Sequence, residues 1–418
     1  MTINRLITSI KRYGLRGIID YALATKKRID KKLFFHKLER SPTDQPIKKG
    51  ITIVGDFSNP HSLSKVLRDL AIMLKKADIP YQAYNTNNSA TIPDSEFAHL
   101  LTPKEKFSLN KYSHIIEMFN YENISLKDKR CHHWRIAFWE FESGLTENHP
   151  EFIDSKRIIA MSNFDEQVLK KLLSSETKVN KILYPFQFDI KSTLPSIAET
   201  RAKYGFENDD FIVFFNFSYA SSYYRKNPEG LISAFAKAFA NNPKTKIFLK
   251  TQGGKKRKAL KQKLDKHISD LGLSKRVIAC DDFLTQDELV AVTKACDVYA
   301  SLHRGEGFGL GIAEAMSLGI PALVTDYSAP TEFCNPNNSC PIPYKIVKVL
   351  DDQRDLEAYK SVKEWAEPNI DAAASALKQL YTDPEYRLRL GANAKKFIEE
   401  YFSTENFKKS INDFLSSY

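Results

Sequence analysis

The stretch SLHRGEGFGLGIAEAMSLGIP, residues 301–321, carries the pattern that decides the fold. The apolar run VYASL (298–302), which overlaps the beginning of this stretch, is typical of a buried strand. The residues after it, HRGEGFG, are expected to form a glycine-containing loop. A helix is expected from about Leu310 to Leu318, ending at Gly319. Strand, loop and helix in this order place the loop outside the carboxyl end of a strand, where open α/β sheets bind ligands.

The same alternation of short apolar strands and helices extends in both directions from this stretch. Strands are expected at 51–57, 81–86, 114–120, 135–141 and 157–163, and a second series at 211–217, 246–251, 276–280, 298–302 and 321–326. Alternating strands and helices predict parallel sheets with helices on both faces. The fold class is therefore α/β, with two similar doubly wound domains.

Four segments follow from this pattern. We expect a basic, amphipathic helical extension and linker at 1–50, an N-terminal α/β domain at 51–200 and a C-terminal α/β domain at 201–395. A C-terminal helix at 396–418 is expected to pack back on the N-terminal domain. The stretch 194–210 is taken as the joint between the two sheets.

The net charge of +11 is concentrated at the N-terminus. Residues 1–40 hold eleven Lys or Arg and three acids, a balance of +8, so the other 378 residues carry only +3. Ile3, Leu6, Ile7 and Ile10 share one helical face, away from Arg5, Arg12 and Arg16. This favours a local anionic partner, the inner face of the cell membrane, over nucleic acid. The alternative is an ordinary helix that packs this apolar face on the N-terminal domain and leaves its basic face in solvent.

The composition also bears on location. Five cysteines without a CxxC pair argue against a disulfide framework or zinc cluster and favour a reducing cytoplasm. No apolar run approaches the length of about 18 residues that spans a bilayer, and no signal-peptide core is evident. We therefore expect a cytoplasmic protein held peripherally at the membrane.

The glycine loop sets two carboxylates beside a candidate phosphate site. The free N–H groups of Phe308, Gly309 and Leu310 at the helix start favour a phosphate. Glu306 would be repelled by phosphate and is expected to face sugar hydroxyls, whereas Glu314 could accept two hydrogen bonds from a ribose diol. Together these features point to a nucleotide sugar. From spacing alone the alternative stays open that Glu306 is solvated and that Glu314 only favours the helix dipole.

The block from 301 to 333, SLHRGEGFGLGIAEAMSLGIPALVTDYSAPTEF, resembles the signature of retaining glycosyltransferases of the large family four, which have the GT-B fold (glycosyl transferases group 1). The segments YYRKNPEGLISAFAKAF (223–239), FLTQDELVAVTKACDVYASL (283–302) and RIAFWEFES (135–143) are similar to other parts of that family. The resemblance covers most of residues 51–410.

The resemblance implies two Rossmann-like domains that face each other across a cleft, an acceptor domain at 51–200 and a nucleotide-sugar-binding domain at 201–395. It also implies roles for particular residues. Glu306 is the first Glu of the family motif and is expected at the donor sugar, and Glu314 is the second and is expected at the ribose. Lys226, together with Arg225, would be the counter-charge to the diphosphate. Many relatives carry an Arg about five residues before this Lys, where the present chain has ASSYY ahead of Arg225, so Arg225 or Arg304 would take that place.

The acceptor is expected on loops of the N-terminal domain. Gly55 allows close backbone approach after the first strand, and His61 could touch the sugar phosphate or acceptor, although a surface histidine without this role is the alternative. Glu140 or Glu142 could bind hydroxyls, with the other pointing to solvent because alternate strand residues face opposite ways. Phe283 stands where a nucleotide base could rest, with packing in the core as the favoured interpretation.

The family implies retention of anomeric configuration, with the departing phosphate oxygen helping to deprotonate the acceptor. No cofactor and no metal site are expected, including at CHHW (131–134), whose histidines and cysteine lack partner ligands at metal spacing. The predicted function is transfer of a hexose or related sugar from a nucleotide sugar to a glycan or lipid-linked glycan, in bacterial surface polysaccharide synthesis. The alternative is a catalytically weak or inactive protein of the same fold that binds nucleotide sugars. Epimerases lack the paired-Glu loop, and phosphorylases have much longer chains with a lysine-bound cofactor.

Overall fold

The computed structural model describes residues 46–87, 92, 97–109, 111–118, 131–146, 149–188 and 194–417. Two compact units are present, one running to Ile136 and including Leu415–Tyr418, the other comprising Ala137–Phe414. The predicted basic extension, residues 1–40, lies outside the described residues. In the described part of the chain, no helix combines the length and the apolar character needed to cross a membrane.

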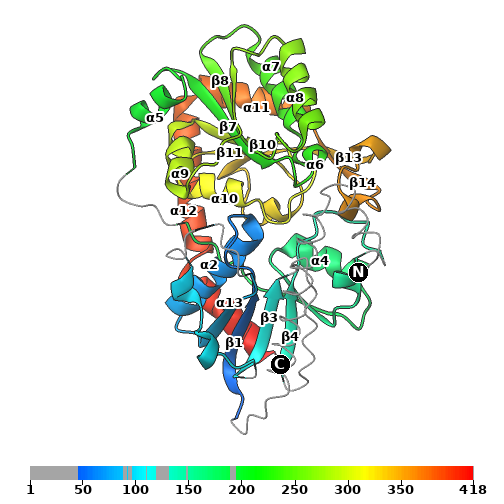
Figure 1. Cartoon of the computed structure of the whole chain (residues 1–418). Coiled ribbons are helices and arrows are strands. Elements are labelled where there is room, and N and C mark those ends of the chain that lie inside the picture. The colour runs from blue at the N-terminus through cyan, green and yellow to red at the C-terminus, as the bar shows by residue number, and fades with distance from the viewer. Residues whose placement is uncertain are drawn as a thin grey trace, which may run out of the picture. The chain divides into compact units, whose positions relative to one another are not determined.

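Two six-stranded sheets form the framework (Figure 1). The first has the order β2-β1-β3-β4-β5-β6 and the second the order β12-β11-β10-β7-β8-β9. The paired strands in both sheets run parallel, so the predicted fold class of two α/β Rossmann-like domains is confirmed. The elements of the first sheet and its connections are β1 (Lys48–Gly55), α2 (Ser62–Lys76), β2 (Tyr81–Asn85), β3 (Tyr112–Met118), β4 (His132–Ile136), α3 (Pro150–Ile153), β5 (Arg157–Ala160), α4 (Asn163–Leu172) and β6 (Lys178–Lys181).

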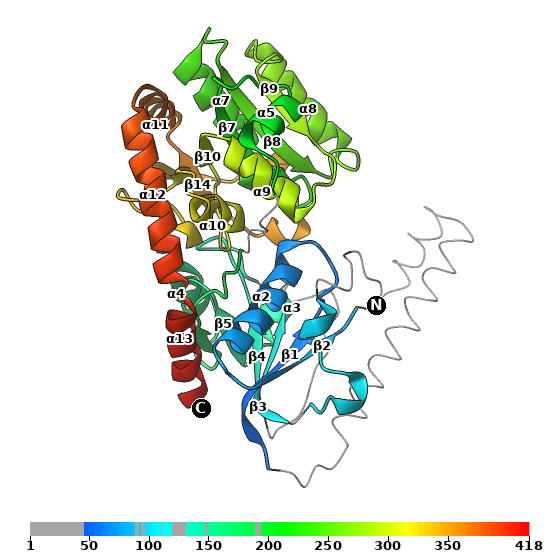
Figure 2. The same ribbon diagram turned by 90° about the vertical axis from the view of Figure 1, so that its left-hand side faces the viewer.

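The second sheet carries the block that resembles the family signature. Its elements are α5 (Ile197–Lys203), β7 (Phe211–Ser218), α6 (Tyr223–Lys226), α7 (Pro228–Phe239), β8 (Thr245–Gln252), α8 (Lys258–Asp270), β9 (Val277–Cys280), α9 (Gln286–Ala295), β10 (Val298–Ser301), α10 (Leu310–Ser317), β11 (Ala322–Thr325) and β12 (Ser339–Ile342). A separate antiparallel hairpin, β13 (Tyr344–Lys348) and β14 (Glu364–Pro368), follows. The chain ends in α11 (Ile370–Thr382), α12 (Pro384–Tyr401) and α13 (Thr404–Ser416), seen in succession in Figure 2.

The central strands of the second sheet are buried on both faces. In β7, Phe214 and Phe215 point to opposite faces, and each is only 1% exposed. A strand covered on both sides has a continuous apolar sequence, as FIVFFNF does. The helices begin where the sequence provides caps: Thr285 and Glu288 form a capping box at α9, and Asn369 caps α11.

Several predicted boundaries shift in the structure. The strand expected at 135–141 is β4 at His132–Ile136, and residues 137–140 have no regular structure. The joint 194–210 contains α5, which begins with a capping box between Ser196 and Glu199. The break expected near Ser403 separates α12 from α13 as predicted. Ser410 of α13 accepts a hydrogen bond from the Leu183 N–H at 2.8 Å.

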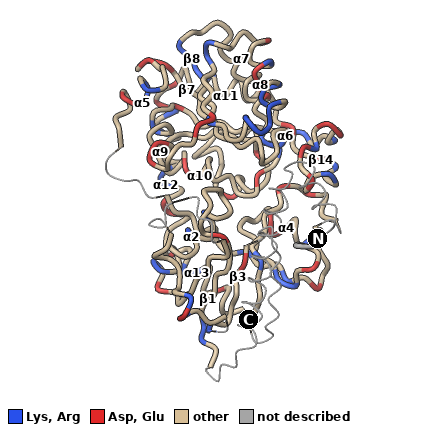
Figure 3. Tube along the Cα trace, in the orientation of Figure 1, with Lys and Arg blue, Asp and Glu red and all other residues tan. Residues whose placement is uncertain are grey.

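Charges of both signs alternate along the described trace (Figure 3). Many of the exposed pairs are helical neighbours, such as Lys261 with Asp265 and Lys266 with Asp270, both at 2.6 Å. Exposed pairs of this kind each contribute well under about 1 kcal/mol to stability. This mixed surface agrees with the near-neutral balance outside residues 1–40.

Candidate active site

The candidate site is built by two loops that leave the same edge of the second sheet. β7 and β10 are parallel neighbours, so their carboxyl ends lie together. The loop after β7 leads into the one-turn helix α6, which carries Arg225 and Lys226. The loop after β10 carries Glu306 and leads into α10. Asn227 links the two loops, because its Nδ2 donates to the Leu302 carbonyl oxygen at 2.9 Å.

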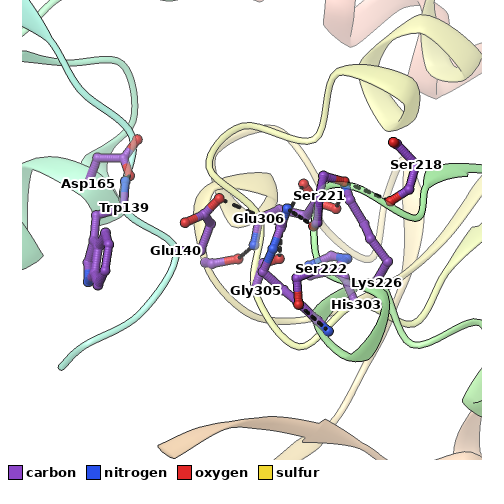
Figure 4. A network of polar contacts seen from close by, with 12 residues as sticks. Trp139, Glu140, Asp165, Ser218, Ser221, Ser222, Lys226, His303, Gly305 and Glu306 are labelled. Carbon is purple, nitrogen blue, oxygen red and sulfur yellow. Dashed lines mark hydrogen bonds and ion pairs between the residues drawn. The ribbon is translucent and has the colours of Figure 1, made fainter. Parts of the chain in front are cut away.

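Three charged side chains meet between these loops. Lys226 Nζ forms an ion pair with Glu306 Oε1, and Arg225 Nη1 lies 3.4 Å from Glu306 Oε2. Arg225 also donates to the carbonyl oxygens of Gly305 at 2.7 Å and Ser221 at 2.9 Å. Figure 4 shows Lys226 and Glu306 close together, with Glu140 directed toward the Gly305–Glu306 loop.

This cluster is shielded from water. Glu306 is 7% exposed and Arg225 is 5% exposed, which overturns the alternative in which Glu306 is solvated. Burial by itself would raise the pKa of the Glu306 carboxyl, but the positive charges of Lys226 and Arg225 outweigh it and lower that pKa to about 2. Burial lowers the pKa of Lys226, although Glu306 opposes the change. Two buried cations and one ionised carboxylate suit the binding of an anion better than that of a neutral molecule.

The glycines of the loop are required by close packing. A Cβ on Gly305 would lie 2.8 Å from the Glu140 carbonyl oxygen, and a Cβ on Gly307 would lie 2.9 Å from the Phe138 Cβ. Gly309 has φ of +90°, a left-handed conformation that L side chains rarely adopt. Gly305 and Gly307 thus allow the loop to approach residues 138–140 closely.

Helix α10 begins at this glycine turn and directs its first N–H groups out of the helix end. The Gly309 carbonyl oxygen accepts from Ile312 N at 2.9 Å, whereas the first N–H groups of any α-helix have no acceptor within the helix. Glu314 lies one turn further on and is 8% exposed. Gly311 lets α10 pack on the sheet, since a Cβ there would lie 2.6 Å from the Tyr299 hydroxyl. The aromatic ring of Phe308 is buried and stacks on Tyr184 with centroids 3.5 Å apart. The part of this residue that could contact a phosphate is therefore its backbone N–H.

The two candidate arginines occupy different surroundings. Arg304 is held by the Glu367 carboxylate, with Nη2 at 2.9 Å from Oε1, and its guanidinium lies 5.0 Å from the Trp365 ring centroid. Arg304 Nη1 also donates to the Tyr224 carbonyl oxygen at 2.6 Å. Arg225 is therefore the arginine whose guanidinium lies beside Glu306.

Glu140 and Glu142 separate as one inward and one outward residue. The Glu140 Oε1 lies 3.7 Å from Arg225 Nη1, and its side chain is 13% exposed. Glu142 is 56% exposed at its side chain and lies 3.8 Å from Lys171. Phe283 is 68% exposed, so the expectation that it packs in the core is wrong; it stands in the loop after β9, where too few apolar neighbours follow in sequence to cover it.

The candidate acceptor residues Gly55 and His61 both shape the start of α2. A Cβ on Gly55 would lie 2.3 Å from the Leu67 Cδ1, so the glycine permits α2 to pack against the end of β1. His61 is the N-cap of α2, and its Nδ1 accepts from Ser64 N at 3.2 Å. Burial lowers the pKa of His61, which favours the neutral ring needed for that acceptor role.

Two residues near Glu306 were missed from the sequence. His303 is fully buried, with Nε2 at 3.2 Å from the Tyr327 carbonyl oxygen and Nδ1 at 3.3 Å from Ser301 Oγ, and burial lowers its pKa to about 4. Ser328 has φ of +65° and its Oγ accepts from Glu306 N at 2.8 Å. Both fix the backbone of the glycine loop, and neither contact can be read from residue spacing.

Among the described residues, one group of acids has oxygen atoms close enough to share a metal ion: Glu207, Asp209 and Asp210. They precede the amino end of β7, whereas Arg225 and Lys226 follow its carboxyl end. The eight-residue strand separates the two places by about 26 Å. Lys244 already pairs with Glu207 and Asp209. This cluster is not part of the candidate site.

Residues 196–397 match the family model described as glycosyl transferases group 1. An uncharacterized glycosyltransferase of Methanocaldococcus jannaschii is 24% identical over 266 residues, which is 62% of this chain and 60% of that protein. The match thus spans less than two thirds of the relative.

Solved structures share the fold at low identity. HepE of Anabaena, in a complex with UDP and glucose, has a TM-score of 0.61 at 16% identity, over 88% of this chain and 100% of that one. Sucrose-phosphate synthase of Thermosynechococcus elongatus has a TM-score of 0.63 at 15% identity, over 88% and 99%. A glycosyltransferase of Rickettsia africae has a TM-score of 0.62 at 13% identity, over 88% of this chain and 98% of that one. Residues 196–397 therefore form a region similar to glycosyl transferases group 1, and the chain with its two parallel six-stranded sheets has the GT-B fold of these solved structures.

Proposed function

We propose that the protein is a glycosyltransferase that moves a hexose or related sugar from a nucleotide sugar to a glycan or lipid-linked glycan. The observation that carries the proposal is the buried cluster of Lys226, Arg225 and Glu306 beside the start of α10. In the absence of donor the two cations are paired with Glu306. The diphosphate of a nucleotide sugar supplies the charge that they would neutralise as the glycosidic bond breaks.

The proposed roles follow the chemistry of each group. Lys226, Arg225 and the N–H groups of Phe308, Gly309 and Leu310 bind the diphosphate and stabilise its developing charge. Glu306 accepts hydrogen bonds from the donor sugar, and Glu314 accepts them from the ribose. Glu140 lies beside Arg225 and is placed to touch donor or acceptor hydroxyls. Gly55 and His61 are proposed for the acceptor side.

We further propose retention of configuration without a metal. The two cations already supply the positive charge that a metal would bring to the leaving group. His303 is a poor general base, because burial lowers its pKa to about 4 and both ring nitrogens have partners. The departing phosphate oxygen is then the proposed acceptor of the proton from the incoming hydroxyl.

A thermal-shift screen against UDP, GDP, dTDP and CMP tests the donor site. At least one nucleotide should raise the melting temperature. At 100 times its Kd, a bound nucleotide adds roughly 3 kcal/mol to the free energy of unfolding. Glu314→Ala should reduce that shift, and excess EDTA should leave both binding and transfer intact. A flat response to all four nucleotides contradicts the donor site, and a loss of activity in EDTA that added metal restores contradicts the metal-free proposal.

We propose that residues 1–40 hold the enzyme at the cytoplasmic face of the cell membrane, where a lipid-linked acceptor of surface polysaccharide synthesis would lie. Each Lys or Arg near an anionic leaflet contributes about 1 kcal/mol, so the balance of +8 suffices for reversible binding. The full-length protein should float with anionic vesicles and be released by high salt. A chain starting at Lys49 should remain unbound yet transfer sugar to a soluble acceptor. Equal flotation of the two chains contradicts this role.

A further inference from the structure

The loop that joins β13 to β14, residues 349–363, has contacts with both sides of the candidate site. We call it the clasp loop. It includes two short 3-10 turns, Asp351–Gln353 and Glu357–Tyr359. Its hairpin belongs to neither six-stranded sheet and lies near α6 in Figure 1.

One side of the clasp loop holds the start of α6. Asp355 Oδ1 accepts from the Ser222 hydroxyl at 2.6 Å, and Asp355 Oδ2 accepts from Tyr223 N at 2.7 Å. Ser222 is the N-cap of α6, and its Oγ also accepts from Arg225 N at 3.3 Å. A single carboxylate thus fixes the cap residue and the first N–H of the helix that carries both cations.

The middle of the clasp loop covers Arg225 and Glu140. The Arg225 guanidinium lies 5.9 Å from the Tyr359 ring centroid, within the range of a cation–π contact. Burial raises the pKa of the Tyr359 hydroxyl, and the nearby Glu140 carboxylate adds to the rise. Its ring also packs edge-on against Phe141 at 5.1 Å and Trp139 at 6.0 Å.

The far side of the clasp loop is fastened to residues 143–149. His149 Nε2 lies 2.9 Å from the Ala358 carbonyl oxygen, so the ring donates there. A Cβ on Gly144 would lie 2.9 Å from the Val362 Cα, which shows how closely the two backbones approach. The loop is therefore anchored at one side and contacts α6 at the other.

Helix α6 needs such support, because it is a single turn between two residues in left-handed conformations. Ser222 has φ of +66° and Asn227 has φ of +53°. A one-turn helix is unstable by itself, and Ser222 has a backbone conformation that residues other than glycine rarely adopt. The arrangement of Arg225 and Lys226 thus depends on contacts from outside the helix.

We propose that Asp355 and Tyr359 are positioning residues, which hold α6 so that Arg225 and Lys226 meet the diphosphate with the spacing that transfer requires. The proposal rests on the proposed function. Neither residue touches the donor. They act through α6, Asp355 at its cap and Tyr359 over the Arg225 guanidinium.

The test is a double-mutant cycle on the full-length protein with the nucleotide sugar that supports transfer. Asp355→Asn should lower kcat about tenfold, the effect of losing one hydrogen bond to a charged group, with a smaller change in KM. In the Lys226→Met background the same change should have little further effect, because the two residues act as one unit. Amide exchange at 223–226 in the ligand-free protein should rise.

Matched variants separate positioning from general stability. Asp352→Asn alters an exposed acid of the same loop and should behave as wild type. Tyr359→Leu should lower kcat more than Tyr359→Phe, which keeps the ring over Arg225. Ser222→Ala removes the hydroxyl that Asp355 binds and should lower kcat by a similar factor. It replaces Asp355→Asn as the test variant if that protein folds poorly.

The outcomes keep the two claims apart. If the wild type is active, an equal kcat for Asp355→Asn and Asp352→Asn overturns the proposed role of the clasp loop. A double variant whose loss of kcat is the product of the Asp355 and Lys226 losses overturns it as well. A wild type that neither binds nucleotides nor transfers sugar overturns the proposed function instead. In that case a rise in amide exchange at 223–226 upon Asp355→Asn would still support the structural part of the clasp.

Discussion

Glu306→Gln is expected to lower turnover by two to three orders of magnitude while the protein stays folded. The scale is that of removing one preorganised polar contact at a transition state. Affinity for the free nucleoside diphosphate should stay the same or improve, because the substitution frees Lys226 and Arg225 from their carboxylate partner. Measured kcat and calorimetric Kd, taken on the same preparation, give the two values. Near-wild-type turnover, or a large loss of diphosphate affinity, contradicts the role of Glu306.

The same variant should be less stable, because it leaves two buried cations with only Glu140 nearby. Removing one partner of a buried pair typically costs about 3–5 kcal/mol. The folded-state pKa of Glu306, about 2, lies below the unfolded value of 4.5, so its stabilising contribution is full above pH 4.5 and is lost as the pH falls toward 2. Urea unfolding of the wild type and Glu306→Gln should therefore converge over that range.

A matched control is available at the opposite end of β10. Asp297 is also a largely buried carboxylate paired with an arginine, at 3.1 Å from Arg201 Nη2. Asp297→Asn should destabilise the protein without changing the turnover of the folded fraction. An equal loss of turnover in Asp297→Asn would mean that the Glu306 effect reports stability alone.

Lys226→Met is the second change with a large expected effect. It removes a buried positive charge but nearly keeps the length of the side chain. Because that charge is proposed to stabilise the leaving diphosphate, kcat should fall roughly 10³-fold. Affinity for a nucleoside diphosphate should fall about 10- to 100-fold, as expected for a charged hydrogen bond, whereas affinity for the nucleoside without phosphates should not change. Titration calorimetry with both ligands makes this comparison.

The control for this variant is Lys263→Met. Lys263 lies close by on α8, 4.6 Å from the Tyr224 ring centroid, but it is 44% exposed and outside the cluster. The Lys263→Met variant should bind the nucleoside diphosphate and transfer sugar as the wild type does. A uniform loss of affinity for nucleoside and diphosphate alike in Lys226→Met would show a general distortion in place of a phosphate contact.

The parts of the fold that the sequence predicts well are those with local causes. The apolar runs of β7 and β10 and the glycine turn before α10 define the second sheet and the place of Glu306. Strands β6 (KVNK) and β12 (SCPI) were missed, because each is four residues long and lacks an apolar pattern. Their place is fixed by pairing with neighbouring strands.

The site is predictable to a similar extent. Glu306 and Lys226 could be named from the motif, but their mutual ion pair joins residues 80 positions apart. Asp355 could not be found, since it lies 133 positions from Ser222 and in a loop without a motif. The choice between Arg225 and Arg304 also depended on tertiary structure, because Glu367 holds Arg304.

The central claim is transfer from a nucleotide sugar through the Lys226, Arg225 and Glu306 cluster. Release of nucleoside diphosphate from a panel of UDP-, GDP- and dTDP-sugars, measured with wild type and Glu306→Gln side by side, tests it most directly. We expect release from at least one donor by the wild type, stimulated by an acceptor, and a loss of two to three orders of magnitude in the variant. Nucleotide binding without release from any donor would favour an inactive binding protein and contradict transfer through this cluster, as would equal release by the two proteins.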